Sequence, residues 1–374
     1  MKIVILTNYA NGLYLFRREL IEQFHKRGHT VLVSVPPDEQ CKKIEQLGCQ
    51  VIPTMLERRS INPIKDFKLF CFYMGLLKRE KPDAVLTYTI KPNLYGGLGC
   101  RLRRVPYLCN ITGLGTAIES GTWLSRILLI FYKAAVAKAK RVFFQNESNR
   151  QFMQEHGIAK KNSMLLPGSG VNLKQHTFET YPSEEDGIRI LTVIRIMREK
   201  GIEEYLEMVS RLAPIQKNVL FFLAGEYEEE EREKYEPIIH RLEEEKVLKY
   251  LGHVNNVHEV MAGCHAILHP SYHEGLSNVL LEGAACGRPL LASDVPGCRE
   301  TMQPDVSGML FAPCRVDAMT EVTERFLLLG AKERERMGMT GRKWVEAHFD
   351  REMVLAAYEE ELQKITEAGI GGTK

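Results

Sequence analysis

Short apolar runs alternate with longer amphipathic stretches along the first half of the chain. The runs predict buried parallel strands, and the stretches between them, most clearly 67–81 before Pro82, predict helices whose apolar positions recur every three to four residues. Because parallel strands need helical crossovers, this rhythm indicates an α/β fold with a doubly wound sheet. The predicted strands are 3–7, 31–35, 51–53, 84–87, 107–111 and 141–144.

The same rhythm restarts after a turn-rich stretch at 173–187. Helices are expected at 202–212, 235–246 and near 257–263. A single core rarely grows beyond about 250–300 residues, and the chain has 374. We therefore expect two Rossmann-like domains that face a central cleft, over residues 1–178 and 179–352. The predicted strands of the second half are 188–194, 219–225, 247–251, 266–268 and 290–293.

Composition and charge narrow the class of protein. No apolar run approaches the ~18 residues of a spanning helix, and the first residues lack the pattern of a signal peptide. Nine scattered cysteines without a C-x-x-C pair are typical of reduced thiols in a cytosolic protein. Residues 1–180 hold 27 Lys+Arg and 13 Asp+Glu (net +14), whereas residues 181–374 hold 23 and 35 (net −12). This split indicates different partners for the two halves; the alternative is a chance imbalance of solvated surface.

The stretch 269–284 carries the strongest chemical signal. It places Glu274 and Gly275 in a turn between a buried strand and a helix that contains Glu282. We expect the N–H groups of Gly275, Leu276 and Ser277 to be unpaired donors at the helix start, where phosphate binds well. Eight residues apart, the two glutamates are not expected to share a helix face. The alternative is a helix-start carboxylate and an ordinary surface glutamate.

Pro-Ser-x-x-Glu-Gly at 270–275, followed by Glu282, resembles the signature of the retaining nucleotide-sugar glycosyltransferases of family four. The match continues through 285–297 with small-Gly-x-Pro, a strand and a turn. The resemblance implies a GT-B fold, a UDP-sugar donor, no metal cofactor, and a last helix at 353–374 that packs back on the first domain. It also implies that Glu274 holds sugar hydroxyls, that Glu282 holds the ribose, and that Gly275, Leu276 and Ser277 cap the phosphates.

Arg195 and Lys200 resemble the basic pair of the same family's Gly-Arg-Leu-x-x-x-Lys-Gly pattern, although Ile194 replaces its glycine. Two cations can neutralise a diphosphate during donor binding and as it leaves. The alternative is an ordinary basic loop. His253 and Val254 resemble the family loop that brackets the nucleotide base, and Gly12 corresponds to the loop that faces the phosphates.

Thr112 and Gly113 are candidates for contacts with the sugar or the acceptor. The stretch 110–116 resembles the sequence of a subset of relatives that transfer N-acetylgalactosamine or related sugars to lipid-linked acceptors in bacterial glycan assembly. The stretches 60–63 and 146–148 resemble the same subset. The alternative for 112–115 is a tight strand-to-loop turn.

The segment 123–133 has a broad apolar side and basic flanks. Such a helix can rest on an anionic membrane or hold a polyprenyl diphosphate tail; the alternative is a buried helix of the α/β domain. The acidic run 226–236 is expected to be a solvated helix. No His, Cys and carboxylate cluster has the spacing of a metal site.

These observations favour a retaining glycosyltransferase that moves a hexose or N-acetylhexosamine from a UDP-sugar to an undecaprenyl-diphosphate-linked glycan. It would work as a cytoplasmic enzyme, peripheral at the inner face of the cell membrane, with Arg195, Lys200 and Glu274 as catalytic residues. Two kinds of alternative stay open: a nucleotide-sugar epimerase or a phosphorylase of the same architecture, and a catalytically silent membrane-associated scaffold. Nucleic-acid binding is not favoured, because the basic half lacks interleaved aromatic residues.

Overall fold

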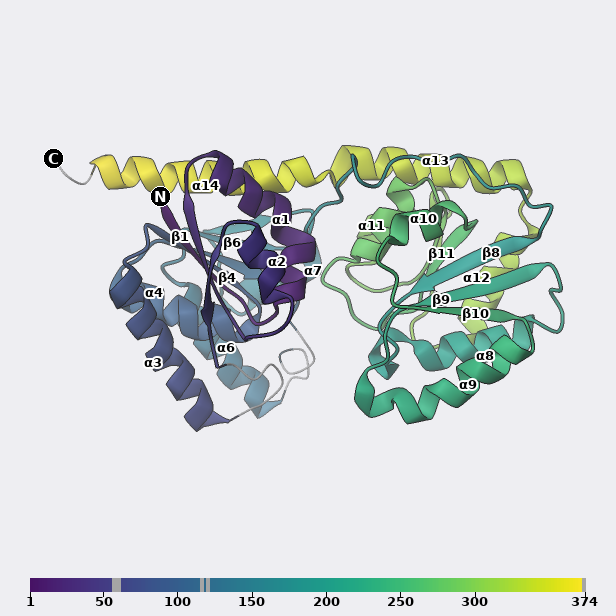
Figure 1. The fold of residues 1–374 in the computed structure, drawn as a ribbon, viewed down its shortest axis with the longest axis horizontal. Coiled ribbons are helices and arrows are strands. Elements are labelled where there is room, and N and C mark those ends of the chain that lie inside the picture. The colour runs from purple at the N-terminus through teal and green to yellow at the C-terminus, as the bar shows by residue number, and fades with distance from the viewer. Residues whose placement is uncertain (56–61, 115–117, 119–121, 372–374) are drawn as a thin grey trace. The chain divides into compact units, whose positions relative to one another are not determined.

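The computed structural model describes residues 1–55, 62–114, 118 and 122–371, and the chain forms two compact units. Unit 1 comprises Met1–Ser169 and Glu352–Lys374, and unit 2 comprises Gly170–Arg351 (Figure 1). The first unit therefore ends earlier than the expected boundary after residue 178.

A parallel sheet forms the centre of unit 1. Among the described residues it has seven strands in the order β3-β2-β1-β4-β5-β6-β7. Their near-continuous apolar sequences suit a sheet that is covered on both faces. The strand order reverses beside β1, which lies between β2 and β4, and ligands of such sheets bind at the carboxyl ends of the strands near this point. The strands are β1 (Lys2–Leu6), β2 (Thr30–Val35), β3 (Gln50–Pro53), β4 (Ala84–Tyr88), β5 (Tyr107–Ile111), β6 (Arg141–Phe144) and β7 (Ser163–Leu165).

Helices cover both faces of this sheet (Figure 1). One core cluster joins the sheet to α3, α4, α6 and α7, and another joins it to α1, α2 and α14. The start of α3 follows the capping rules, because Asn62 accepts hydrogen bonds from the first-turn amides and Pro63 occupies the first helical position. The bounds are α1 (Ala10–Lys26), α2 (Cys41–Gln46), α3 (Pro63–Glu80), η1 (Pro92–Gly96), α4 (Gly97–Arg103), α6 (Trp123–Val136), α7 (Glu147–Glu155) and α14 (Arg351–Gly371).

The last helix, α14, belongs almost entirely to unit 1. Its Tyr358 is fully buried; the hydroxyl is bonded to that of Tyr88 at 3.0 Å, and the ring contacts Phe143. Farther along the helix, Glu361 forms an ion pair with Arg141 at 2.7 Å. The C-terminal segment therefore completes the core of the unit that begins the chain.

Unit 2 repeats the architecture with a second parallel sheet, whose described strands follow the order β10-β9-β8-β11-β12-β13. The strands are β8 (Ile188–Val193), β9 (Val219–Ala224), β10 (Leu248–Gly252), β11 (Ala266–His269), β12 (Leu290–Ser293) and β13 (Gly308–Phe311). The helices are η2 (Arg198–Lys200), α8 (Ile202–Leu212), η3 (Glu229–Glu231), α9 (Arg232–Glu244), α10 (Val257–Ala262), α11 (Asn278–Ala285), η4 (Arg299–Thr301), α12 (Val316–Leu328) and α13 (Ala331–His348).

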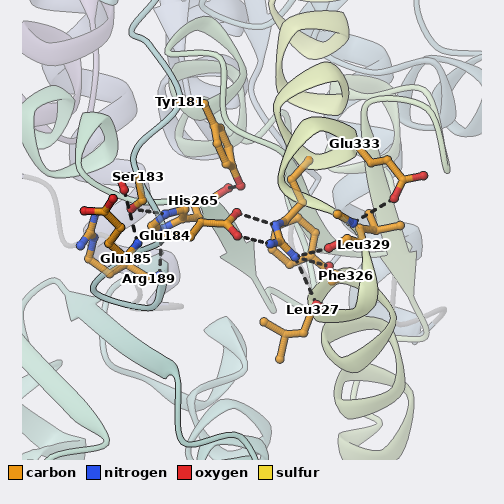
Figure 2. Close-up of polar contacts among 12 residues, drawn as sticks. Tyr181, Ser183, Glu184, Glu185, Arg189, His265, Phe326, Leu327, Leu329 and Glu333 are labelled. Atoms are coloured by element: carbon orange, nitrogen blue, oxygen red, sulfur yellow. Dashed lines mark hydrogen bonds and ion pairs between the residues drawn. The ribbon is translucent and has the colours of Figure 1, made fainter.

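A buried arginine ties α12 and α13 to the segment that precedes β8. Arg334 forms two parallel bonds with Glu184, at 3.0 and 2.6 Å, and its third nitrogen donates to the carbonyls at the end of α12 (Figure 2). The Arg334 side chain is almost inaccessible to solvent. The guanidinium group of Arg334 therefore supplies hydrogen-bond donors both to a carboxylate and to the carbonyls at a helix end, which have no partner within the helix.

We predict that Arg334→Ala lowers the free energy of unfolding of the protein by about 3–5 kcal/mol, because it leaves the Glu184 carboxylate and several carbonyls without their donor. Urea denaturation followed by circular dichroism measures this change. The matched control is Arg325→Ala, which removes the exposed pair with Asp305 and should cost less than about 1 kcal/mol. Equal effects of the two substitutions would contradict the structural role of Arg334.

Candidate active site

The loop between β11 and α11 forms the centre of the site. Helix α11 begins at Asn278, and the side chain of Ser277 caps it by accepting from the amide of Leu280. The backbone N–H of Ser277 donates to the carbonyl of Gly297 at 2.8 Å. The expectation that this N–H is an unpaired donor is therefore wrong, because a second loop supplies its acceptor.

Two glycines allow neighbouring backbones to approach this loop closely. Gly201 has a φ of +74°, and a Cβ at its position would lie 2.1 Å from the carbonyl oxygen of Pro270. Gly297 has a φ of +87°, and its Cβ would lie 2.7 Å from the carbonyl oxygen of Glu274. Any other residue at either position would combine an unfavourable backbone conformation with a steric clash. The loop is thus held between the turn after β8 and the turn after β12.

The predicted residues Lys200 and Glu274 are brought together. The Lys200 Nζ atom lies 2.6 Å from Glu274 Oε1 and 3.3 Å from Ser271 Oγ. The same carboxylate oxygen accepts a hydrogen bond from His269 Nε2 at 3.0 Å, and that nitrogen lies 3.2 Å from Ser277 Oγ. A cation, a carboxylate and a helix-capping hydroxyl therefore form one network around a histidine.

This network determines the charge of Glu274. Burial alone would raise the pKa of its carboxyl group, but the hydrogen bond from His269 and the positive charge of Lys200 outweigh burial and hold the pKa well below its usual range. Glu274 is thus an ionised acceptor for hydroxyl groups, although its side chain is only 15% exposed.

Glu282 has a different environment. Burial raises the pKa of its carboxyl group to about 7, and the charge of Arg351 offsets this only in part. His176 Nε2 lies 4.0 Å from Glu282 Oε1. The two candidate glutamates therefore have different partners and opposite pKa shifts.

Arg195 and His253 contact the acidic run that follows β9. Arg195 Nη1 lies 3.2 Å from Glu228 Oε2, and His253 Nδ1 lies 3.4 Å from Glu226 Oε1. The expectation of a solvated helix over 226–236 is wrong only at its start, because helical structure begins with η3 at Glu229, and Glu226 and Glu228 before it pair with the candidate loops.

The remaining candidate residues lie in the cores of the units or next to strands and helices. In unit 2, Leu276 is buried, and Val254 packs against the same core cluster. In unit 1, Gly12 lies in the first turn of α1, and Thr112 and Gly113 follow β5 directly. The motif residues Gly115, Thr116, Ser60 and Ile61 lie outside the described residues.

His269 and Tyr272 are the contributors that sequence reasoning missed. The Tyr272 hydroxyl donates to the carboxylate of Glu204 at 2.6–2.7 Å, which fixes the loop against α8. The signal for His269 was present: it is a polar residue at the end of an otherwise apolar strand, and such positions face ligands in α/β folds. Its contact with Glu274 required the tertiary structure.

Comparison with known families identifies both halves of the chain. The model described as "Glycosyl transferases group 1" matches residues 174–344, and "Glycosyl transferase 4-like" matches residues 2–146. Both agree with the resemblance found in the sequence, which is thereby confirmed.

Three relatives extend this result. The chain is 26% identical to N,N'-diacetylbacillosaminyl-diphospho-undecaprenol alpha-1,3-N-acetylgalactosaminyltransferase of Campylobacter jejuni, covering 96% of this chain and 97% of that protein. It is 30% identical to alpha-D-kanosaminyltransferase of Streptomyces kanamyceticus, covering 87% and 92%. It is 25% identical to UDP-Gal:alpha-D-GlcNAc-diphosphoundecaprenol alpha-1,3-galactosyltransferase of Escherichia coli, covering 73% of each.

The fold has solved counterparts. The crystal structure of Anabaena Alr3699/HepE in complex with UDP and glucose aligns with a TM-score of 0.79 at 18% identity, covering 97% of this chain and 99% of that one. This similarity confirms the predicted GT-B fold class with two Rossmann-like units.

We predict that Glu282→Gln stabilises the protein at pH 8 by about 2–3 kcal/mol and has little effect at pH 4. Because folding raises the pKa of Glu282 from 4.5 to about 7, its contribution to stability is present below pH 4.5 and is lost as the pH rises through 7. Urea denaturation of both proteins at the two pH values measures this difference.

The control for this prediction is Glu335→Gln, at an exposed position of α13. It should change the stability equally little at both pH values. A Glu282→Gln protein that is no more stable than the wild type at pH 8 would show that the carboxylate is not destabilising.

Proposed function

This chain belongs to the group 1 glycosyltransferases, and we propose that it transfers a hexose or N-acetylhexosamine from a UDP-sugar to an undecaprenyl-diphosphate-linked glycan with retention of configuration. The observation that carries the proposal is the Lys200–Glu274–His269 network, which places an ionised carboxylate of the β11–α11 loop beside a cation of the segment after β8. The named activities of the Campylobacter and Escherichia relatives support the acceptor class, and the latter names a UDP-sugar donor.

In the proposed reaction, an acceptor hydroxyl forms the new bond to the anomeric carbon on the face from which UDP departs. The bond from that carbon to the diphosphate oxygen breaks, and its electron pair leaves with UDP. The acceptor proton passes to an oxygen of the departing phosphate, so no separate protein base is required. Lys200 and Arg195 stabilise the charge that builds on the diphosphate, and Glu274 orients the sugar by accepting hydrogen bonds from its hydroxyl groups.

We propose that the enzyme needs no metal cofactor. Two side-chain cations, Arg195 and Lys200, supply the charge that a divalent ion would otherwise bring to a leaving diphosphate. Among the described residues, no group of His, Cys, Asp and Glu side chains could hold a metal ion.

The remaining donor contacts follow the family pattern. Glu282 holds the ribose hydroxyls, His253 and Val254 lie beside the base, and the turn at Gly275 and Leu276 lies over the phosphates, next to the Ser277 N–H that donates to Gly297. In unit 1 we assign Gly12 to the donor phosphates, and Thr112 and Gly113 to the sugar or acceptor. The epimerase and scaffold alternatives are not favoured, because the named relatives are transferases.

We further propose peripheral contact with an anionic membrane at the cytoplasmic face. No helix among the described residues has the length and apolar character to cross a bilayer. Helix α6 instead buries one side against the sheet and exposes the other, with Trp123 at 74% and Ile130 at 68% accessible. Arg126 and Lys133 are exposed on the same helix. Apolar side chains flanked by cations suit the interface of an anionic bilayer.

We predict that Lys200→Ala lowers kcat by roughly 100-fold, because it removes a preorganised cation from the leaving diphosphate. Radiolabel transfer from UDP-sugars to lipid-linked glycan in membranes measures this loss. The control is Lys217→Ala, an exposed lysine in the turn before β9, which should keep the wild-type rate.

Calorimetry with UDP, GDP and ADP tests the donor class independently of the acceptor. UDP should bind, and GDP and ADP should bind much more weakly. Preference for GDP would overturn the donor assignment, whereas binding of no nucleotide would overturn the whole function. A Lys200→Ala enzyme with unchanged turnover would overturn the role of that residue alone.

For the membrane contact, we predict that Trp123→Ser combined with Ile130→Ser weakens binding to vesicles containing phosphatidylglycerol by at least ~10-fold, since each large side chain contributes about 1.5–3 kcal/mol when fully buried in an apolar phase. Vesicle sedimentation measures the bound fraction. Leu328→Ser, which changes a highly exposed apolar residue of unit 2, is the control and should have no effect. Equal binding by the double variant and the wild type would exclude this face of α6.

A further inference from the structure

The turn that follows β4 in unit 1 contains a strained backbone. Thr89 alone separates Tyr88, the last residue of β4, from the helical segment that begins at Ile90, and its φ is +71°. This left-handed conformation is ordinary for glycine but rare for a β-branched residue, whose side chain crowds the backbone there. The other described non-glycine residues with a positive φ include no β-branched residue. The strain is therefore a particular feature of this turn.

Buried hydrogen bonds hold both sides of the turn in place. The Thr87 hydroxyl donates to Asn93 Oδ1 at 2.6 Å, which joins the chain before Thr89 to the chain after it. Asn93 Nδ2 donates to the Asn110 carbonyl at 2.8 Å, and Asn110 Nδ2 donates to the Thr87 carbonyl at 3.1 Å. All three side chains are almost inaccessible to solvent. A strained conformation persists only where the surrounding structure fixes it in this way.

The turn lies at an edge of the sheet where ligands are expected. Strand β4 pairs with β1, beside which the strand order reverses, and doubly wound sheets bind ligands at the carboxyl ends of such strands. The helical segment after the turn contains the π-helix η1, and π-helical turns are frequent at functional sites. Because Tyr88 pairs with Asn110 in the sheet, Thr89 lies beside the start of the segment that carries Thr112 and Gly113.

The hydroxyl group of Thr89 has no partner among the described residues. Its Oγ1 atom is buried and forms no hydrogen bond with them, although the residue as a whole is partly exposed. A buried hydroxyl without a partner costs free energy, as does the strained backbone, so neither feature stabilises the fold. A ligand can recruit this hydroxyl through a change of side-chain rotamer, because the hydroxyl has no hydrogen bond to lose.

The chemistry of the turn favours a hydroxyl group as the ligand. A threonine hydroxyl both donates and accepts a hydrogen bond, as a sugar hydroxyl does. Lys91 is the one charged residue of the segment 88–93, and its ammonium group is paired with Asp66 at 2.8 Å. Both side chains of this pair are little exposed. The segment therefore presents a neutral group, which suits a carbohydrate better than a phosphate.

We propose that the Thr89 hydroxyl binds a hydroxyl group of the acceptor glycan, and that the strained turn holds the side chain where this contact is made. The donor contacts, apart from that of Gly12, are assigned to loops of unit 2, which leaves the carboxyl ends of β4 and β5 for the acceptor. The proposal rests on the proposed function for the presence of a glycan acceptor. It adds a residue that lies outside the sequence motifs.

The test compares Thr89→Gly with the wild type. Glycine relieves the strain, so urea denaturation should show a folding equilibrium constant about 5-fold larger for the variant. Radiolabel transfer from UDP-sugars to lipid-linked glycan should fall by roughly 10-fold at a low concentration of membranes, because one hydrogen bond to the acceptor is lost. A high concentration of membranes should recover part of the rate. UDP binding, measured by calorimetry, should be unchanged.

Two further variants separate the strain from the hydroxyl group. Lys246→Gly changes an exposed residue of unit 2 with a φ of +58°, in the turn before β10. It should also gain stability, but it should transfer sugar at the wild-type rate. Thr89→Ser keeps the hydroxyl group and should retain most of the transfer activity at a low concentration of membranes.

The proposal is contradicted if Thr89→Gly transfers sugar like the wild type at a low concentration of membranes. It is also contradicted if this variant is less stable than the wild type, which would make Thr89 a residue of the fold alone. Failure of the wild type itself to bind UDP or to transfer any sugar would instead contradict the proposed function. The two failures are therefore distinguishable.

Discussion

The ion pair between Lys200 and Glu274 is the interaction on which the site in unit 2 depends. Burial opposes the ionised form of a carboxylate, and a carboxylate that lost its charge would be a poorer acceptor for sugar hydroxyls. The nearby cation and the hydrogen bond from His269 reverse this effect. The fold supplies the pair directly, because Lys200 follows β8, Glu274 follows β11, and these strands are neighbours in the parallel sheet.

The contrast with Glu282 shows how one short stretch holds two carboxylates with different properties. Glu282 is about as buried as Glu274, but the charge of Arg351 only partly offsets burial, and the pKa is raised to about 7. A carboxylate with this pKa makes the folded protein less stable when it ionises, so Glu282 does not owe its place to stability at neutral pH, which is compatible with the proposed role in binding ribose. The two glutamates thus divide into one whose pKa is held well below its usual range and one whose pKa is raised to about 7.

The sequence predicted the two sheets, the two Rossmann-like units, and the positions of Lys200 and Glu274 after two of their strands, because apolar periodicity and parallel-strand topology determine where such loops emerge. It did not predict partners that come from distant segments. The carbonyl of Gly297 accepts the hydrogen bond of the Ser277 amide. The Glu226 carboxylate pairs with His253, and the Glu228 carboxylate pairs with Arg195. Spacing along the chain contains no information on these contacts, since each joins loops that follow different strands.

The pairing of Arg195 with Glu228 has a consequence for specificity. A diphosphate that reaches Arg195 must compete with a carboxylate that already lies 3.2 Å from the guanidinium. A diphosphate carries more charge than one carboxylate, and it offers several oxygens in the bidentate geometry that arginine prefers. It can therefore displace the Glu228 carboxylate from Arg195, whereas a singly charged ligand would not. Because the pair is exposed to solvent, the exchange costs little. If Arg195 binds the donor as proposed, the neighbouring Glu228 would therefore favour diphosphates over singly charged anions.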